Sequence, residues 1–178
     1  MIKAVAFDLG RVFIDIKNVS LNPTEKILSM TFDYKVGEKL FWDWAEGETG
    51  LDIKKLQEIS WNTINKIYEI REPDIFTKLP KLKFATASNH ISMIKDWLKK
   101  KGVYDNFYCH VISEDIRCMK PSYKFYEILI EKLEEKPEDV LFVDDKKKNI
   151  EGAKKAGFKT LLYDGQVPLS ESILKVIL

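Results

Sequence analysis

Short apolar runs alternate with helix-like patterns along most of the chain, and this alternation constrains its fold more than any other feature. Apolar, strand-favouring residues occupy positions 5–7, 82–87, 107–112, 140–143 and 160–163, with periodic amphipathic segments between them. Strands that alternate with helices are typical of a parallel sheet covered on both faces. We therefore predict an α/β fold built on a doubly wound parallel sheet.

The first apolar run ends on an acid. Residues 5–7 lead into Asp8, Leu9 and Gly10, which together read as a buried strand followed by a tight turn. In open α/β sheets, ligands bind outside the carboxyl ends of the strands. Asp8 is therefore the first candidate for a functional residue. The alternative is that Asp8 only caps a turn.

A segment with helical signals interrupts the alternation after this first strand. Asn22, Pro23 and Glu25 have the spacing of a helix N-cap, a first-turn proline and a capping-box acid. Asp52 can cap a longer helix whose apolar residues recur every three to four positions. We predict a small helical insertion over residues 15–71, between two parts of a core domain that spans residues 1–14 and 72–178.

Large aromatic residues are concentrated in this insertion. Phe41, Trp42, Trp44 and Trp61 all fall within it. A small helical unit needs large side chains to bury enough apolar area, which favours a role in the insertion's own core. A wall that faces a substrate is the alternative interpretation.

The overall composition indicates a globular protein without a strongly charged partner. The chain has 178 residues, and its 29 basic and 28 acidic side chains nearly balance. We therefore expect neither a nucleic-acid nor a membrane partner, and we see no sign of an obligate protein partner. Cys109 and Cys118 form no Cys-x-x-Cys pair and follow no signal peptide, which favours the reducing cytoplasm. His90 and His110 are too few for a zinc site and are interpreted as structural.

Polar residues follow four of the predicted strands or open the helices after them, and in a doubly wound sheet such positions converge on one edge. These residues are Asp8, Ser88, Asn89, Lys120, Asp144 and Asp145. Local alternatives exist: a helix cap for Ser88, a solvated side chain for Lys120 and a turn for the acidic pair. The convergence of all of them favours a single site.

The same positions carry a resemblance to the haloacid dehalogenase superfamily. The matching stretches are Ala-Phe-Asp-Leu-Gly-Arg-Val at 6–12, Ala-Ser-Asn at 87–89, Met-Lys-Pro at 119–121 and Phe-Val-Asp-Asp-x-x-x-Asn-Ile-x-Gly-Ala at 142–153. Each stretch alone is weak evidence, but their order and spacing resemble that family over nearly the whole chain. The resemblance implies a Rossmann-like core, and the predicted insertion resembles the family's small helical cap.

The resemblance also implies a phosphatase chemistry. Asp8 would be the nucleophile that attacks phosphorus and forms an aspartyl-phosphate. The cofactor would be Mg²⁺, held by Asp8, the carbonyl oxygen of Gly10 and Asp144, with Asp145 as a ligand or a supporting residue and Asn149 in support. The Ser88 hydroxyl and the backbone N–H of Asn89 would hold phosphate oxygens at a helix N-terminus. Lys120 would bind the same oxygens and pair with the carboxylates.

One position departs from the family's usual pattern. Phosphatases that resemble this chain carry a second Asp two residues after the nucleophile, as general acid and then base, whereas this chain has Gly10. Three functions therefore compete: a Mg²⁺-dependent phosphatase of small phosphorylated metabolites, among them sugar phosphates; a weak or inactive phosphate-binding relative; and a dehalogenase, which needs no metal. The paired acids Asp144 and Asp145 favour the first.

Other charged residues supply hypotheses about the same region. The run Lys146–Lys148 is either a solvated helix face or a group that steers an anionic substrate. If another acid replaces the carboxylate missing at position 10, the candidates are Asp15, Asp43, Glu46 and Glu48.

Overall fold

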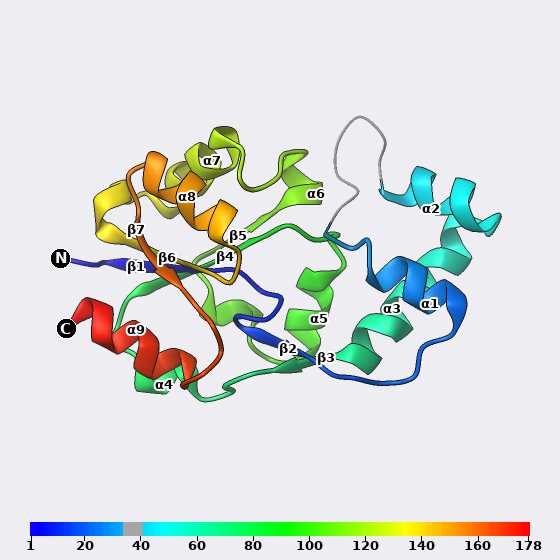
Figure 1. Ribbon diagram of the computed structural model, residues 1–178, viewed down its shortest axis with the longest axis horizontal. Coiled ribbons are helices and arrows are strands. Elements are labelled where there is room, and N and C mark those ends of the chain that lie inside the picture. Colours follow the sequence, from blue (N-terminus) through cyan, green and yellow to red (C-terminus); the bar gives the residue numbers. More distant parts are fainter. Residues whose placement is uncertain (34–40) are drawn as a thin grey trace.

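A five-stranded parallel sheet forms the centre of the protein in this computed structural model, which describes residues 1–33 and 41–178. The strand order is β5-β4-β1-β6-β7, and every neighbouring pair is parallel (Figure 1). The strands are β1 (Ala4–Phe7), β4 (Lys83–Ser88), β5 (Cys109–Ile112), β6 (Val140–Asp144) and β7 (Lys159–Leu162). The predicted α/β fold with a parallel sheet is therefore confirmed.

Helices cover both faces of this sheet (Figure 1). One face carries α7 (Tyr123–Leu133) and α8 (Lys147–Lys155), and the other carries α4 (Ile75–Lys78), α5 (Ile94–Lys100) and α9 (Leu169–Ile177). The short elements α6 (Ser113–Ile116), η1 (Tyr104–Asn106) and η2 (Pro137–Asp139) lie in the connections. No helix among the described residues is both long and apolar enough to cross a membrane.

The alternation of side chains in β1 explains why both faces are covered. Ala4 and Ala6 pack in a cluster with residues of α7, while Val5 and Phe7 belong to the cluster on the opposite face, with Trp97 of α5. All of these side chains are fully buried. Since β1 is the central strand and buried on both faces, its sequence reads as a continuous apolar run rather than an alternating one.

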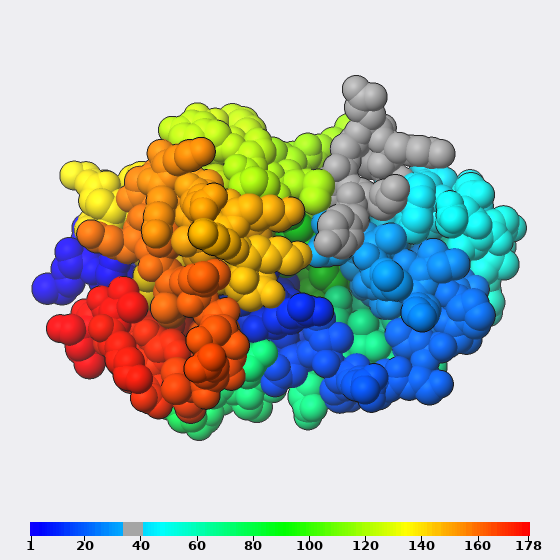
Figure 2. All heavy atoms as spheres, in the orientation of Figure 1, coloured from blue at the N-terminus to red at the C-terminus, as the bar shows by residue number. Residues whose placement is uncertain are grey.

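The predicted insertion lies at one end of the sheet and will be called the helical segment (residues 15–71). It contains α1 (Pro23–Ser29), α2 (Phe41–Thr49) and α3 (Ile53–Ile67), which form one end of the molecule in Figure 2. No strand was predicted in this segment from the sequence, but a short pair of strands lies at its two ends. Here β2 (Ile14–Ile16) pairs with β3 (Tyr68–Ile70) in an antiparallel ribbon, and strands of three residues are too short for a recognisable period. Its division from the core as a separate domain stays a prediction.

Both predicted helix starts in this segment are confirmed. The Asn22 side chain accepts a hydrogen bond from the Glu25 N–H, and the Glu25 carboxylate accepts one from the Asn22 N–H, each at 2.9 Å. Asp52 accepts a hydrogen bond from the N–H of Lys55 at 2.9 Å. Lys66 of α3 also pairs with Glu25 at 2.6 Å, which joins α3 to α1.

The tryptophans of the helical segment act as packing residues. Trp42, Trp44 and Trp61 are partly buried and pack against the larger hydrophobic cluster, and Phe41 is fully buried within it. Phe41 contacts the rings of Trp42 and Trp44, with centroids 4.9 and 5.8 Å apart. These contacts favour the core interpretation of the aromatic residues over a wall that faces a substrate.

Candidate active site

Asp8 lies at the carboxyl end of the central strand, between the ends of β4 and β6. Its N–H donates to the Val143 carbonyl at 2.8 Å, and only 7% of the residue is exposed. One carboxylate oxygen, Oδ1, accepts hydrogen bonds from the Leu9 N–H at 2.8 Å and the Ser88 hydroxyl at 3.1 Å. Among the described residues no hydrogen bond goes to Oδ2. Oδ1 is therefore fixed in place, and Oδ2 is available for chemistry.

Lys120 lies between Asp8 and Asp144, the acid at the end of β6. Its Nζ lies 3.0 Å from Asp8 Oδ1 and 2.6 Å from Asp144 Oδ2, and the side chain is 1% exposed. Burial disfavours the charged ammonium, but the two carboxylates outweigh this effect and raise the pKa of Lys120. Lys120 is therefore a buried cation next to Asp8, and the two carboxylates favour its charged form.

Asn89 positions Lys120 through its side chain. Asn89 Oδ1 accepts the Lys120 N–H at 2.8 Å, and Asn89 Nδ2 donates to the Lys120 carbonyl at 3.0 Å. The predicted helix N-terminus at this place was wrong, because α5 starts only at Ile94, after a loop. A phosphate group at Ser88 would therefore meet loop N–H groups instead of a helix end.

Three carboxylates meet beside this cation. Asp8, Asp144 and Asp145 each offer a ligand oxygen, and these atoms lie within 4.8 Å of one another. Asp144 is already well bonded, since it accepts from the Lys146 N–H at 2.8 Å and from Asn149 Nδ2 at 3.0 Å. Asp145 differs: its Oδ1 is buried and has no hydrogen-bond partner in the described part of the chain.

The electrostatics of this cluster suit a divalent cation. With all groups ionised, three carboxylates and the single ammonium of Lys120 leave an excess of buried negative charge. Burial raises the pKa of Asp144 despite the nearby Lys120, and burial together with Asp144 raises the pKa of Asp145. Mg²⁺ prefers oxygen ligands, and the buried Asp145 oxygen without a partner is available to bind it, so the residues fit the predicted cofactor.

Asn149 holds Asp144 in position, as expected. Its Nδ2 lies 3.0 Å from both oxygens of Asp144, and its carbonyl accepts the Tyr126 hydroxyl at 2.7 Å. Asn149 is 1% exposed and lies on α8, directly after β6. The acid and its support therefore come from one strand–helix connection.

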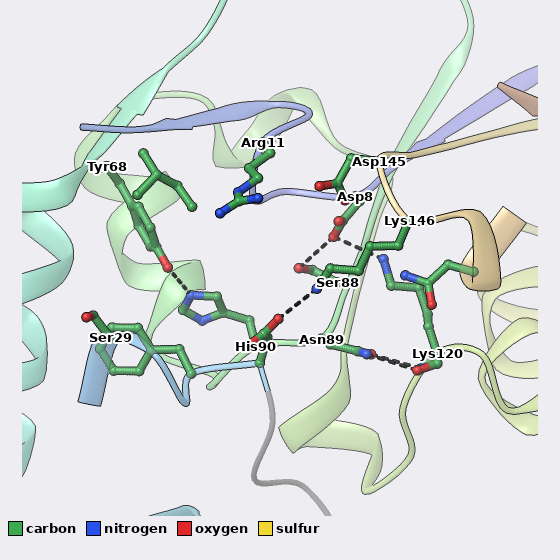
Figure 3. A pocket seen from close by; sticks show the side chains of 15 residues that line it. Asp8, Arg11, Ser29, Tyr68, Ser88, Asn89, His90, Lys120, Asp145 and Lys146 are labelled. Carbon is green, nitrogen blue, oxygen red and sulfur yellow. Dashed lines mark hydrogen bonds and ion pairs between the residues drawn. The ribbon is translucent and has the colours of Figure 1, made fainter. Parts of the chain in front are cut away.

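A cavity of about 250 Å³ opens over these residues (Figure 3). Figure 3 shows Asp8, Asp145 and Lys146 on one side of this pocket, with Tyr68 and Ser29 on the other. Predicted site residues that line the cavity are Asp8, Gly10, Ser88, Asn89, Lys120, Asp145 and the supporting Asn149. Asp144 lies beneath them and is completely buried. The sequence-based prediction missed Arg11, Ile16, Ser29, Phe32, Asp33 and Tyr68. Arg11 lies within the first matching stretch but was given no role, and the other five belong to none of the four stretches.

The two histidines are bonded within the fold. Burial lowers the pKa of His90 to about 4, so its ring is neutral near pH 7. The ring Nδ1 lies 3.0 Å from the Ile91 carbonyl oxygen, which can only accept, so Nδ1 carries the proton and donates it. In the neutral ring Nε2 is then an acceptor, and the Tyr68 hydroxyl donates to it at 2.9 Å. His110 stacks on Tyr104 with ring centroids 4.0 Å apart. This bonding agrees with the predicted structural role.

The lysine run divides between the two predicted roles. Lys147 and Lys148 are exposed on α8, which agrees with a solvated helix face. Lys146 lines the cavity and pairs with Asp33 of the helical segment at 2.8 Å. Of these three lysines, only Lys146 is therefore placed to act on a substrate.

The acids predicted to replace the missing carboxylate lie elsewhere. Asp15 pairs with Arg71 at 2.5 Å, and Asp43, Glu46 and Glu48 are exposed on α2. None of the four lines the cavity over Asp8. Gly10 does line it, and a Cβ built there meets no atom of the described residues within 4 Å.

Residues 48–163 match the sequence profile of the haloacid dehalogenase-like (HAD-like) hydrolases, which covers more than half of the chain. The chain belongs to this family. It is therefore a HAD-like hydrolase, and the resemblance noted in the sequence is confirmed. The matched region includes Ser88, Lys120 and Asp144, whereas Asp8 precedes it. The comparison with curated proteins gave no significant match.

Solved structures of low sequence identity share the fold. A predicted HAD-like family hydrolase from Porphyromonas gingivalis has 21% identity and a TM-score of 0.75, over 99% of this chain and 98% of its own. A HAD family enzyme from Bacteroides thetaiotaomicron, in complex with magnesium and inorganic phosphate, has 18% identity and a TM-score of 0.72. The match covers 96% of this chain and 98% of that enzyme. L-2-haloacid dehalogenase from Xanthobacter autotrophicus has 23% identity and a TM-score of 0.68. The match covers 90% of this chain and 76% of the dehalogenase.

Proposed function

We propose that this protein is a Mg²⁺-dependent phosphatase of small phosphorylated metabolites that reacts through an aspartyl-phosphate on Asp8. The observation that carries the proposal is the meeting of Asp8, Asp144 and Asp145, with a buried, unpartnered oxygen on Asp145. A dehalogenase has no use for a metal next to its nucleophile, whereas a phosphatase must neutralise both a carboxylate and a phosphate. The magnesium and phosphate bound by the Bacteroides relative support the same choice.

Asp8, Asp145 and the carbonyl oxygen of Gly10 would hold the metal, with Asp144 as a further oxygen ligand. When bound, Mg²⁺ would neutralise charge on the phosphate and orient it toward the nucleophile. Asn149 and Lys120 keep Asp144 in a fixed position through the hydrogen bonds described above.

The protein's own groups then perform the transfer in two steps. Asp8 Oδ2 attacks phosphorus, and the bond from phosphorus to the leaving-group oxygen breaks. Ser88 and Lys120 already contact Oδ1, so they lie close enough to hold phosphate oxygens during the attack. Water then attacks the aspartyl-phosphate, which frees phosphate and restores the Asp8 carboxylate.

The size of the cavity supports a small substrate. Its volume of about 250 Å³ falls below the range of about 300–1,000 Å³ that is typical of pockets for drug-sized ligands. The phosphate occupies part of that space, beside Asp8. A leaving group of sugar size is compatible with the remainder, and Ser29 and Tyr68 offer it hydroxyl groups.

A panel of substrates tests this function. The wild-type protein is assayed with aryl, acyl, sugar and alkyl phosphates and with 2-haloacids, each with Mg²⁺ and with EDTA. We expect Mg²⁺-dependent release of phosphate and no halide release. Metal-independent halide release would instead establish a dehalogenase, which the likeness to the Xanthobacter enzyme makes the second candidate. Phosphate binding without turnover would mark an inactive relative.

Replacing Asp145 by Asn is expected to weaken Mg²⁺ binding by at least about tenfold. The change keeps the shape of the side chain but removes the charge of Asp145, whose Oδ1 is the one buried, unpartnered carboxylate oxygen of the described residues. Isothermal titration of Mg²⁺ into the variant and the wild type measures the difference. Glu151→Gln on α8, an exposed acid outside the cavity, is the matched control. An unchanged Mg²⁺ affinity in Asp145→Asn would exclude this residue from the metal site.

Replacing Gly10 by Asp is expected to raise turnover of alkyl phosphates more than that of aryl phosphates. Open space around Gly10 accommodates the side chain, and a carboxylic acid there can protonate a poor leaving group. General acid catalysis contributes about 10²–10⁴-fold, and an acidic leaving group needs little of it. Steady-state assays of both esters measure the ratio. An equal or larger gain on the aryl ester would contradict the argument.

A further inference from the structure

Asp33 is the one acid of the described residues in this cavity that has no role in the site so far. The acids that line the cavity are Asp8, Asp33 and Asp145. Asp8 is the proposed nucleophile, and Asp145 belongs to the proposed metal site. Asp33 comes from the opposite side of the cavity, since it follows α1 in the helical segment.

An ion pair fixes the Asp33 carboxylate in this place. Its Oδ2 lies 2.8 Å from Nζ of Lys146, which itself lines the cavity. The Lys146 N–H donates to Asp144, so the ammonium that holds Asp33 extends from the loop beside the acid cluster. Figure 3 shows the Lys146 side chain reaching along the pocket toward Ser88.

The position of Asp33 suits a proton acceptor. Lys146 holds its Oδ2 at 2.8 Å, and the carboxylate lines the same cavity as Asp8, where it can receive a proton from a water molecule. In the two-step reaction above, the first step needs a proton donor for the leaving group, and the second needs an acceptor for the proton of water. The Asp33 carboxylate is placed to meet the second requirement.

We infer that Asp33 is the general base for hydrolysis of the aspartyl-phosphate, a role that Gly10 cannot fill. The inference rests on the proposed phosphatase function. The oxygen of a water molecule bonds to phosphorus while one of its protons moves to the Asp33 carboxylate. The bond from phosphorus to the Asp8 oxygen breaks, and its electron pair returns to the Asp8 carboxylate. Asp33 then loses its proton to solvent.

With Asp33 as the base, the two steps of the reaction differ in whether a group is available for proton transfer. The second step has its base, so the wild-type protein does not accumulate the aspartyl-phosphate. The first step lacks a proton donor among these acids, so it is slow for substrates with poor leaving groups. Removing the Asp33 carboxylate should slow only the second step, by about 10²-fold, within the range of general base catalysis.

Rapid-mixing kinetics with an aryl phosphate and Mg²⁺ tests the inference. For Asp33→Asn we expect a burst of one aryl leaving group per active site at the wild-type rate, followed by turnover about 10²-fold slower than that of the wild type. Intact-protein mass spectrometry should then find a phosphoryl group on the variant. The wild type should show neither the burst nor the added mass.

Three further variants separate a base from a structural contact. Lys146→Gln breaks the same ion pair but leaves the carboxylate, so we expect a raised KM without a burst. Asp33→Glu should recover a large part of the lost turnover. Asp43→Asn removes an exposed acid of the helical segment that does not line the cavity, and it should show no burst.

The outcomes distinguish this inference from the function it rests on. If the wild type releases no phosphate from any ester, both are overturned. If the wild type turns over but Asp33→Asn shows no burst, the assignment of Asp33 alone is overturned. A burst of the same size in Lys146→Gln would overturn it too, because the ion pair and not the base would then explain the effect.

Discussion

Replacing Asp8 by Asn is expected to abolish turnover, with a loss on the order of 10⁴-fold or more, as is usual when a nucleophile is removed. An amide is too weak a nucleophile to attack phosphorus. The fold should survive, because the amide oxygen can still accept the hydrogen bonds from Leu9 and Ser88. Lys120 also keeps its shorter contact to Asp144, at 2.6 Å.

Steady-state assays with Mg²⁺ and an aryl phosphate measure the loss, and circular dichroism with thermal unfolding confirms the fold. Asp15→Asn is a suitable control, because Asp15 pairs with Arg71 and does not line the cavity. Turnover by Asp8→Asn within tenfold of the wild type would contradict the assignment of the nucleophile.

Replacing Lys120 by Met is expected to lower the free energy of unfolding by about 3–5 kcal/mol in buffer without Mg²⁺. Methionine has nearly the same length but no charge, so the buried carboxylates of Asp8 and Asp144 lose the cation that lies between them. Mg²⁺ should recover part of this loss, because it binds the folded state and supplies positive charge to the same carboxylates. The increase in stability with Mg²⁺ should therefore be larger in the variant than in the wild type.

Urea unfolding with and without Mg²⁺ measures these differences. Lys124→Met on α7 is the matched control, since the Lys124 side chain is 66% exposed and its pair with Glu127 is a surface contact of 3.5 Å. That change should cost less than about 1 kcal/mol. If Lys120→Met without Mg²⁺ has the same free energy of unfolding as the wild type, then Asp8 and Asp144 do not need this cation to remain buried.

The core strands and the residues at their ends could be predicted from the sequence because the signal is local. The central strands β1 and β6 are buried on both faces and therefore read as uninterrupted apolar runs. The polar residue at the end of such a run marks the edge of the sheet. Asp8, Ser88 and Lys120 were found in this way, and the structure joins them by direct contacts.

Local patterns failed where the structure depends on distant partners. The β2–β3 ribbon joins residues 14–16 to residues 68–70, and strands of three residues have no period of their own. A helix N-terminus was predicted at Ser88 and Asn89, but α5 begins only at Ile94. The loop before it is held by the His90 N–H, which donates to the Ser113 hydroxyl at 3.0 Å. Contacts between distant segments produce no recognisable pattern in the sequence of either segment alone.

The sequence by itself determined the fold class, the family and the acids, lysine and serine at the edge of the sheet, because strand ends and motifs are properties of neighbouring residues. Only the tertiary structure decided which residues complete the cavity. Asp33, far from any motif, meets Lys146 across it, whereas Asp15, Asp43 and the other acids expected to replace the missing carboxylate lie outside. The physical reason is that the packing of the helical segment against the sheet sets the position of each of these acids, and that packing is the sum of many contacts between distant residues.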